Sequence, residues 1–301
     1  MADKAHRLTD EKLEEMERHL SAIYSRAEKE IGVAWAKYIS EVGKEIEGLQ
    51  KDYDVVKKSG NRDEIKAVGR KLAAAKRERL LLDKHYRELT KKIAKEISDV
   101  NKIALAYING ELPQIYSINY NALEEIVEGV GGYAFELTDA DTVKFLATTN
   151  ASLLPYKEID EKKDVRWNTK KINAEVLQGI LQGEAMDKIA ERLSNVEEMN
   201  KVSAIRNART MVTGAENKGR FDSYERAAAD GIVLEKEWID TNDQRVRHTH
   251  AVLGDGKTIP YDEPFDNGLM YPGDPNGDPS EVYNCRCTMV AKVIGFKKVE
   301  K

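Results

Sequence analysis

The five residues Lys57-Lys58-Ser59-Gly60-Asn61 separate two long segments in which apolar residues recur at steps of three and four. This spacing is typical of one long helix that packs on another, because it gathers the apolar side chains on one face. Gly60 can adopt the left-handed conformation that ends a helix, and Asn61 with Glu64 can cap the next one. We therefore predict a long antiparallel helical hairpin. Its apolar stripes comprise Leu13, Met16, Leu20, Ile23, Ala27, Ile31, Trp35, Tyr38, Val42, Ile46, Leu49, Tyr53 and Val56 before the turn, and Ile65, Val68, Leu72, Ala75, Leu82, Tyr86, Leu89, Ile93, Ile97, Val100, Ala104 and Tyr107 after it.

Three consecutive domains follow from the pattern on either side of the turn. Residues 1–110 form the hairpin, whose second helix we expect to end at Asn109-Gly110-Glu111-Leu112-Pro113. Residues 111–164 form a connector, and residues 165–301 form a domain of helices followed by a small antiparallel sheet. The predicted fold is mainly α, and α+β overall. Its expected short elements are helices near 123–128 and 141–148, a strand at 133–137, and paired strands at Ile232–Ile239 and Thr288–Ile294.

The composition favours long, solvent-exposed helices over a compact enzyme, because charged residues make up 34% of the chain and aromatic residues 7%. No run approaches the roughly 18 apolar residues that span a bilayer, and the N-terminus lacks the apolar core of a signal peptide. We therefore expect a soluble protein made in a reducing cytosol. Residues 57–102 carry an excess of Lys and Arg, which indicates either contact with DNA or an acidic protein, or simply a solvated helix face.

A loop rich in glycine and proline joins the two expected strands of the C-terminal domain. His248 and His250 lie near its start, and Cys285 and Cys287 lie at its end. Residues two apart on an extended chain face the same side, so each pair could chelate one ion. Two imidazoles and two thiolates would complete a tetrahedral zinc site that pins both ends of the loop.

Two other interpretations of these residues stay open. Cys285 and Cys287 could alternate in a strand as one buried and one exposed thiol, and His248 and His250 would diverge if they lay on a helical turn. Alternatively, one cysteine could act as a nucleophile with His250 as its base.

The basic residues near the histidines and cysteines could bind phosphates, or they could form internal ion pairs that hold loops together. The second interpretation is favoured. These basic residues are Arg206, Arg209, Lys218, Arg220, Arg226, Arg245, Arg247 and Arg286.

The order of residues in the C-terminal domain resembles that of the phage Mu F-like minor head proteins. Gly179-Ile180-Leu181-Gln182-Gly183, Ala204-Ile205-Arg206-Asn207-Ala208-Arg209-Thr210 and Ala215-Glu216-Asn217 resemble the helical entry of that family. The family's core motif is similar to the ordered set Trp238, Asp243, Arg245, Arg247, His250, Gly254, Phe265, Pro272, Glu281, Asn284, Cys285, Arg286 and Cys287.

This chain departs from the family's pattern near the histidines. Val246 stands where the family has Thr, and His248 is not a motif position. Of the four candidate metal ligands, only His250, Cys285 and Cys287 match the motif, so a fourth ligand would be Asp243, water or nothing.

The resemblance implies a non-enzymatic minor capsid protein that acts in head morphogenesis of a tailed bacteriophage. Such a protein would associate with the portal protein, and scaffold, major capsid protein and double-stranded DNA are further candidate partners. We expect assembly in the bacterial host's cytoplasm, a place in the virion's capsid interior near the portal, and neither membrane binding nor a small-molecule substrate. No cofactor is required, and zinc would be purely structural.

Two rival functions remain on the residues alone. One is a metal-dependent nuclease or hydrolase that uses His248 and His250, since a metal with an open position activates water. The other is a structural DNA-binding protein that acts without the portal, whose binding would weaken steeply with salt.

Overall fold

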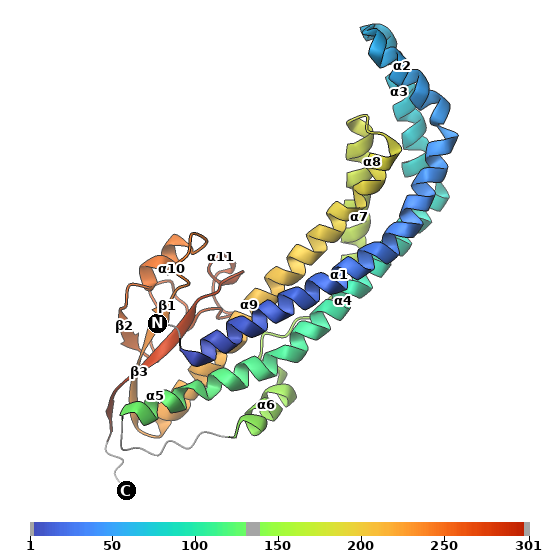
Figure 1. The fold of residues 1–301 in the computed structure, drawn as a ribbon. Coiled ribbons are helices and arrows are strands. Elements are labelled where there is room, and N and C mark those ends of the chain that lie inside the picture. The colour runs from blue at the N-terminus through green and yellow to red at the C-terminus, as the bar shows by residue number, and fades with distance from the viewer. Residues whose placement is uncertain (1–2, 131–138, 298–301) are drawn as a thin grey trace. The chain divides into compact units, whose positions relative to one another are not determined.

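The computed structural model describes residues 3–130 and 139–297, and confirms the prediction of a mainly helical protein with a small antiparallel sheet (Figure 1). The strand expected at residues 133–137 lies outside the described residues. No helix in the described ranges is long and apolar enough to cross a membrane. The helices are α1 (Lys4–Glu45), α2 (Glu47–Ser59), α3 (Arg62–Arg77), the π-helix η1 (Glu78–Leu82), α4 (Lys84–Tyr120), α5 (Ala122–Val130), α6 (Ala140–Thr149), the 3₁₀-helix η2 (Ala151–Leu153), α7 (Glu161–Leu181), α8 (Met186–Glu191), α9 (Leu193–Ala229), α10 (His248–Leu253) and α11 (Pro279–Val282). The strands are β1 (Ile232–Ile239), β2 (Thr258–Pro260) and β3 (Thr288–Phe296).

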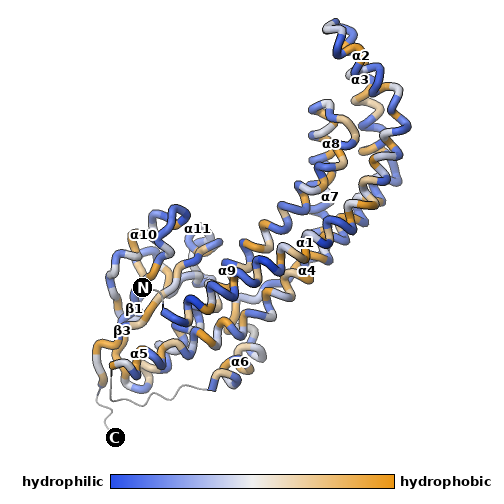
Figure 2. Tube along the Cα trace, viewed as in Figure 1, coloured by the Kyte–Doolittle hydropathy of each residue, from blue (hydrophilic) through white to orange (hydrophobic). Residues whose placement is uncertain are grey.

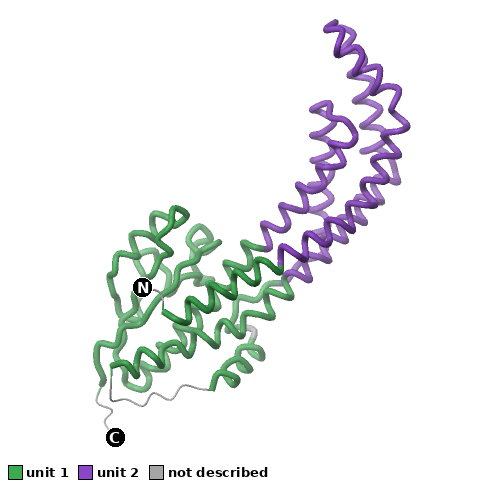
Figure 3. The backbone as a smooth tube through the Cα atoms, in the orientation of Figure 1, with its two compact units in different colours: residues 1–19, 105–157, 205–301 green, residues 20–104, 158–204 purple. Residues whose placement is uncertain are grey.

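The chain folds into two compact units, each made of separate segments (Figure 3). Unit 1 contains residues 1–19, 105–157 and 205–301, and unit 2 contains residues 20–104 and 158–204. This division differs from the three consecutive domains expected at 1–110, 111–164 and 165–301. The expected boundaries follow changes of pattern along the chain, whereas α1, α4 and α9 each contribute residues to both units.

The predicted helical hairpin is present in unit 2. Gly60 takes the left-handed conformation with φ of 75°, and the Asn61 side chain accepts hydrogen bonds from the backbone N–H groups of Asp63 and Glu64. The two arms are less regular than two continuous helices. Ile46 interrupts the first arm between α1 and α2, and the π-helix η1 interrupts the second between α3 and α4. The hydrophobic period alone did not indicate these interruptions.

The hairpin arms do not pack only on each other. Within unit 2 they share one core with α7, α8 and the beginning of α9, and hydrophilic and hydrophobic residues alternate along these helices (Figure 2). The Trp35 indole donates to the Ala190 carbonyl at 3.1 Å. A buried chain of side-chain hydrogen bonds, 2.7 to 2.8 Å long, joins four helices. It runs from Tyr24 to Asn101, Asn200 and Asn168.

The prediction that Asn109-Gly110-Glu111-Leu112-Pro113 ends a helix is wrong. Helix α4 continues through Pro113 to Tyr120. Proline removes one backbone donor from a helix, but burial outweighs that cost here, since Leu112 and Ile115 are fully buried. The Asn109 side chain is used instead to hold the connector, because it bonds to both the N–H and the carbonyl of Lys157.

The sheet of unit 1 has the order β2-β1-β3, with antiparallel pairs throughout, so the predicted pairing of β1 with β3 is confirmed. Alternate residues of β1 are buried, which gives the sheet one face that packs on a core. That core includes Trp238 of β1, Phe221 of α9, Val127 of α5 and Phe265 of the long loop. The loop between β1 and β3 therefore contributes side chains to the same core as the sheet.

Helices α4 and α9 approach closely at Gly219 in unit 1. A Cβ atom added there would lie 2.5 Å from the Tyr116 carbonyl oxygen and 3.1 Å from the Tyr120 nitrogen. Both atoms belong to backbone, which cannot rotate away. Gly110 of α4 offers the opposite case, because a Cβ added there meets nothing within 4 Å.

We predict that Gly219→Ala lowers the free energy of unfolding by about 1–3 kcal/mol through overpacking. The matched control Gly110→Ala should raise it by about 0.5–1 kcal/mol, because alanine is the better helix former. Denaturant unfolding followed by circular dichroism measures both effects. Equal changes in the two variants would contradict the close approach.

Candidate functional site

Three buried side chains from two segments meet in unit 1. His250 lies in α10, and Cys285 and Cys287 lie in the turn between α11 and β3. The His250 Nδ1 atom is 3.6 Å from the Cys285 sulfur and 3.4 Å from the Cys287 sulfur. All three donor atoms lie within 4.8 Å of one another, and the residues are 1%, 1% and 3% exposed. The described residues thus form a Cys₂His set that could hold a soft metal ion.

His248 does not join this group. It is exposed at the first residue of α10, whereas His250 is buried two residues later. Residues two apart on a helix point to different sides, so a site that uses both imidazoles is not formed among the described residues. The sequence-based site with four protein ligands is corrected to one with three.

The two cysteines do not alternate between the interior and solvent. Both are free thiols and both are buried. They lie in a turn before β3 and not in the strand itself, so the alternation of a strand does not apply to them. A hydrogen bond from the Cys287 thiol, together with His250, holds the pKa of Cys285 well below its ordinary value. Cys285 is therefore the thiol of the pair that loses its proton first.

Glu281 of α11 orients the imidazole. Its carboxylate lies 3.0 Å from His250 Nε2, and it also accepts hydrogen bonds from the Thr249 hydroxyl and the Asn267 amide. The Trp238 ring packs edge-on against His250 at 5.0 Å between centroids. When Nε2–H donates to Glu281, the Nδ1 lone pair is left facing the two sulfur atoms.

The sequence Asn284-Cys285-Arg286-Cys287 turns sharply because Asn284 adopts the left-handed conformation with φ of 59°, which asparagine tolerates. Arg286 donates to both carboxylate oxygens of Asp243, at 2.7 and 2.9 Å, and this lowers the pKa of Asp243 to about 2. Asp243 is thus engaged by arginine and does not belong to the Cys₂His set.

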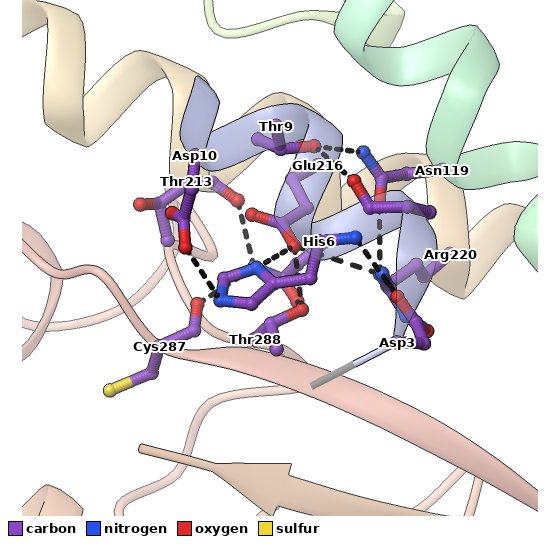
Figure 4. A network of polar contacts seen from close by, with 12 residues as sticks. Asp3, His6, Thr9, Asp10, Asn119, Thr213, Glu216, Arg220, Cys287 and Thr288 are labelled. Atoms are coloured by element: carbon purple, nitrogen blue, oxygen red, sulfur yellow. Dashed lines mark hydrogen bonds and ion pairs between the residues drawn. The ribbon is translucent and has the colours of Figure 1, made fainter. Parts of the chain in front are cut away.

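Helix α9 holds the turn from the other side. The Thr213 hydroxyl donates to the Cys285 carbonyl at 2.6 Å, and the Asn217 amide donates to the Cys287 carbonyl at 3.1 Å. The Asn217 carboxamide oxygen accepts the Met289 N–H at 3.0 Å. Figure 4 shows the result, in which Cys287 directs its backbone oxygen toward this polar face while its sulfur points away.

Comparison with known proteins agrees with this layout. Residues 170–290 match the family described as phage Mu protein F like protein. The chain is also 26% identical to minor head protein GP7 of Bacillus phage SPP1 over 290 residues, which cover 94% of this chain and 87% of GP7. Residues 170–290 therefore form a phage Mu F-like domain, within a chain that is similar to a minor head protein along almost its whole length. This similarity supports a role in head morphogenesis.

A shorter similarity concerns part of an enzyme. The NAD(+)–arginine ADP-ribosyltransferase EFV of Enterococcus faecalis is 32% identical over 123 residues, which cover 40% of this chain and 25% of that protein. No solved structure matches the chain significantly.

The residues that match the family motif have structural roles in this chain. Trp238 packs on the imidazole, Asn284 shapes the turn, and Arg247 donates to the Tyr283 carbonyl. Most basic residues considered for phosphate binding lie in internal ion pairs. The pairs are Arg209–Glu17, Lys218–Asp222, Arg220–Asp3, Arg226–Asp230, Arg245–Asp243 and Arg286–Asp243.

A second polar cluster lies beside the turn in unit 1 (Figure 4). Arg220 of α9 is 1% exposed and donates to the Asp3 carboxylate, the Asn119 side chain and the Met289 carbonyl. Glu216, one turn earlier, accepts from the Thr288 hydroxyl at 2.7 Å and lies 2.7 Å from His6 Nδ1. The same face of α9 thus binds the beginning of α1, the end of α4 and the beginning of β3.

The sequence analysis named Glu216 and Asn217 in the family resemblance and Arg220 among the basic residues, but it gave none of them a part in positioning the site. Thr213, Glu216, Asn217 and Arg220 recur at helical spacing, and such a polar stripe within an otherwise apolar helix face is the signal that could have identified them. Lys236 was also missed. It is fully buried between the Phe221 and Phe265 rings and donates to the Met270 carbonyl, and burial lowers its pKa to about 8.

The His6–Glu216 pair predicts a pH dependence of stability. Burial acts to lower the pKa of His6, but the Glu216 carboxylate outweighs it and the net pKa is raised above 6.5. A raised histidine pKa contributes stability that is complete below pH 6.5 and is lost as the pH rises through the folded-state value. Asp10 and Arg220 also act on His6, and Asp10 titrates in the acid range.

We therefore predict that the wild-type chain loses more unfolding free energy than His6→Asn as the pH rises from below 6.5 to about 8. Denaturant unfolding at several pH values in both proteins measures the difference. Parallel curves through this range would show that the Glu216 contact does not hold a proton on His6.

Proposed function

We propose that this chain is a non-enzymatic minor head protein that binds the portal protein from the capsid interior. The observation that carries the proposal is the match to GP7, which extends over 94% of the chain and so includes the helical segments outside residues 170–290. If the chain shared only its C-terminal domain with GP7, the similarity would not extend into these helical segments.

We assign the portal contact to unit 2. Leu177 and Leu181 lie four residues apart on α7, so they share one face, and their exposed fractions are 44% and 73%. Leu181 also lines a hollow of about 360 Å³ with Tyr53 and Ile65 of the hairpin arms. Single exposed apolar residues are common, but an adjacent pair beside a hollow suits a protein partner.

The geometry of unit 1 supports a non-enzymatic role. His250 has one ring nitrogen at Glu281 and the other facing two sulfur atoms, so neither is available to activate water for an external substrate. The metal-dependent nuclease or hydrolase would need His248 and His250 together, and they diverge. A thiol nucleophile would have to be reached by its substrate, and both thiols are buried.

The basic residues of 57–102 fit a solvated helix face better than a DNA site. Several lie in ion pairs with acidic residues of the same unit, which reduces the charge that a phosphate would meet. We therefore propose contact with the portal, and not with DNA, as the role of unit 2. The pairs include Lys84–Glu88, Lys92–Glu96, Lys95–Asp99 and Lys102–Glu161.

The test is co-purification of the phage's portal protein with the full chain and with the double variant Leu177→Glu/Leu181→Glu. We expect the amount of co-purified portal protein to fall about tenfold or more in the double variant, because charges at the centre of an interface are strongly unfavourable. Deleting residues 1–110 would be less informative, since it also removes Asp3 and His6 from unit 1.

The matched control is Val252→Glu/Ile294→Glu, which places the same charges on exposed apolar positions of unit 1. It should retain portal as the wild type does, and nuclease treatment before capture should change nothing. Full retention of portal by the unit 2 variant would contradict the assignment. So would loss of portal by the control alone.

A further inference from the structure

We propose that His250, Cys285 and Cys287 bind a structural zinc ion. A tetrahedral zinc ion, with bonds of about 2.3 Å to sulfur and 2.0 Å to nitrogen, separates those two ligands by about 3.5 Å. The His250 Nδ1 atom lies 3.6 and 3.4 Å from the two sulfur atoms. The three donors are thus already spaced as the ligands of one ion.

The donor types select the metal class. Thiolate and imidazole ligands favour zinc over magnesium or calcium, which prefer oxygen. The two thiols are free, and a disulfide between residues two apart would be strained. Binding releases the remaining thiol protons to solvent, because the thiolate is the ligand.

Glu281 supplies an independent argument. Metal-bound histidines usually donate their other ring N–H to a carboxylate or carbonyl, which fixes the tautomer and aims the ligand nitrogen. The His250 Nε2 atom is 3.0 Å from the Glu281 carboxylate. Thr249 and Asn267 in turn hold that carboxylate.

The ion would be closed in by protein. The three ligands are buried, and the indole N–H of the neighbouring Trp238 has no hydrogen-bond partner among the described residues. Asp243 is held by Arg286, so it is not a fourth protein ligand. The ion then ties α10 to a turn 35 residues later, which stabilises the long loop.

Metal analysis of the purified full chain tests the proposal. Inductively coupled plasma mass spectrometry should find about one zinc per chain in the wild type. The variants Cys285→Ser and His250→Ala should contain almost none. The matched control His248→Ala changes an exposed histidine two residues away in the same helix, and it should keep its zinc.

A second measurement does not depend on whether a variant folds. The wild-type chain is stripped with a chelator under reducing conditions and then given cobalt(II). Tetrahedral thiolate coordination should produce the charge-transfer and visible absorption bands of a cobalt–sulfur site, and zinc should abolish them. A reduced chain that binds neither ion, or a Cys285→Ser variant that keeps one zinc, would overturn the proposal in favour of a hydrogen-bonded thiol pair.

The role of Glu281 has its own readout. We expect Glu281→Ala to weaken zinc affinity by roughly 10–100-fold while the cobalt spectrum keeps its thiolate bands, since the carboxylate orients the imidazole without touching the ion. Unchanged affinity in Glu281→Ala would remove Glu281 from the site.

Discussion

The carboxamide of Asn217 is completely buried in α9 and satisfies the backbone on both sides of the entry to β3. Its amide donates to the Cys287 carbonyl, and its oxygen accepts from the Met289 N–H and the Thr288 hydroxyl. A buried carbonyl or N–H without a hydrogen-bond partner destabilises the folded state by about 1–3 kcal/mol. The Asn217 side chain removes this penalty from the backbone of the buried turn. The position of this turn determines where the sulfur atoms of Cys285 and Cys287 lie.

The same helix face extends this effect to the rest of unit 1. Glu216 lies one residue before Asn217 and contacts His6 of α1. Arg220 lies three residues after Asn217 and donates to Asp3 and to the Asn119 side chain of α4. Cys287 therefore stands between two environments. Its backbone belongs to a polar network on α9 (Figure 4). Its sulfur belongs to the Cys₂His set, 3.4 Å from the Nδ1 atom of His250 in α10. The family motif and the helical entry that precedes it are thus parts of one structural arrangement.

The sequence predicted the elements whose signal is local. The turn at Gly60, the strands β1 and β3, and the meeting of His250 with the two cysteines all follow from spacing or residue type. The continuation of α4 through Pro113 could not be predicted, because it depends on the burial of Leu112 and Ile115 in a core that the local pattern does not show. The division into units was also inaccessible, since it groups segments by packing and not by chain order.

The site residues show the same limit. Ligand atoms come from residues with distinctive chemistry, so they stand out in a sequence, whereas Thr213 and Asn217 are ordinary polar residues until their backbone partners 70 or more residues away are known. His248 was misplaced for the opposite reason. Its chemistry suited a metal, but α10 turns it to solvent.

Hydrogen–deuterium exchange of the full chain, wild type against Asn217→Leu, tests most directly whether α9 holds the turn. Leucine keeps the branched shape of the side chain but offers no hydrogen bonds, so the account predicts much faster exchange at the amides of residues 285–289. Exchange at the hairpin turn around Gly60, in the other unit, should stay the same. Unchanged protection of residues 285–289 in the variant would contradict the account, because something other than Asn217 would then position the cysteines.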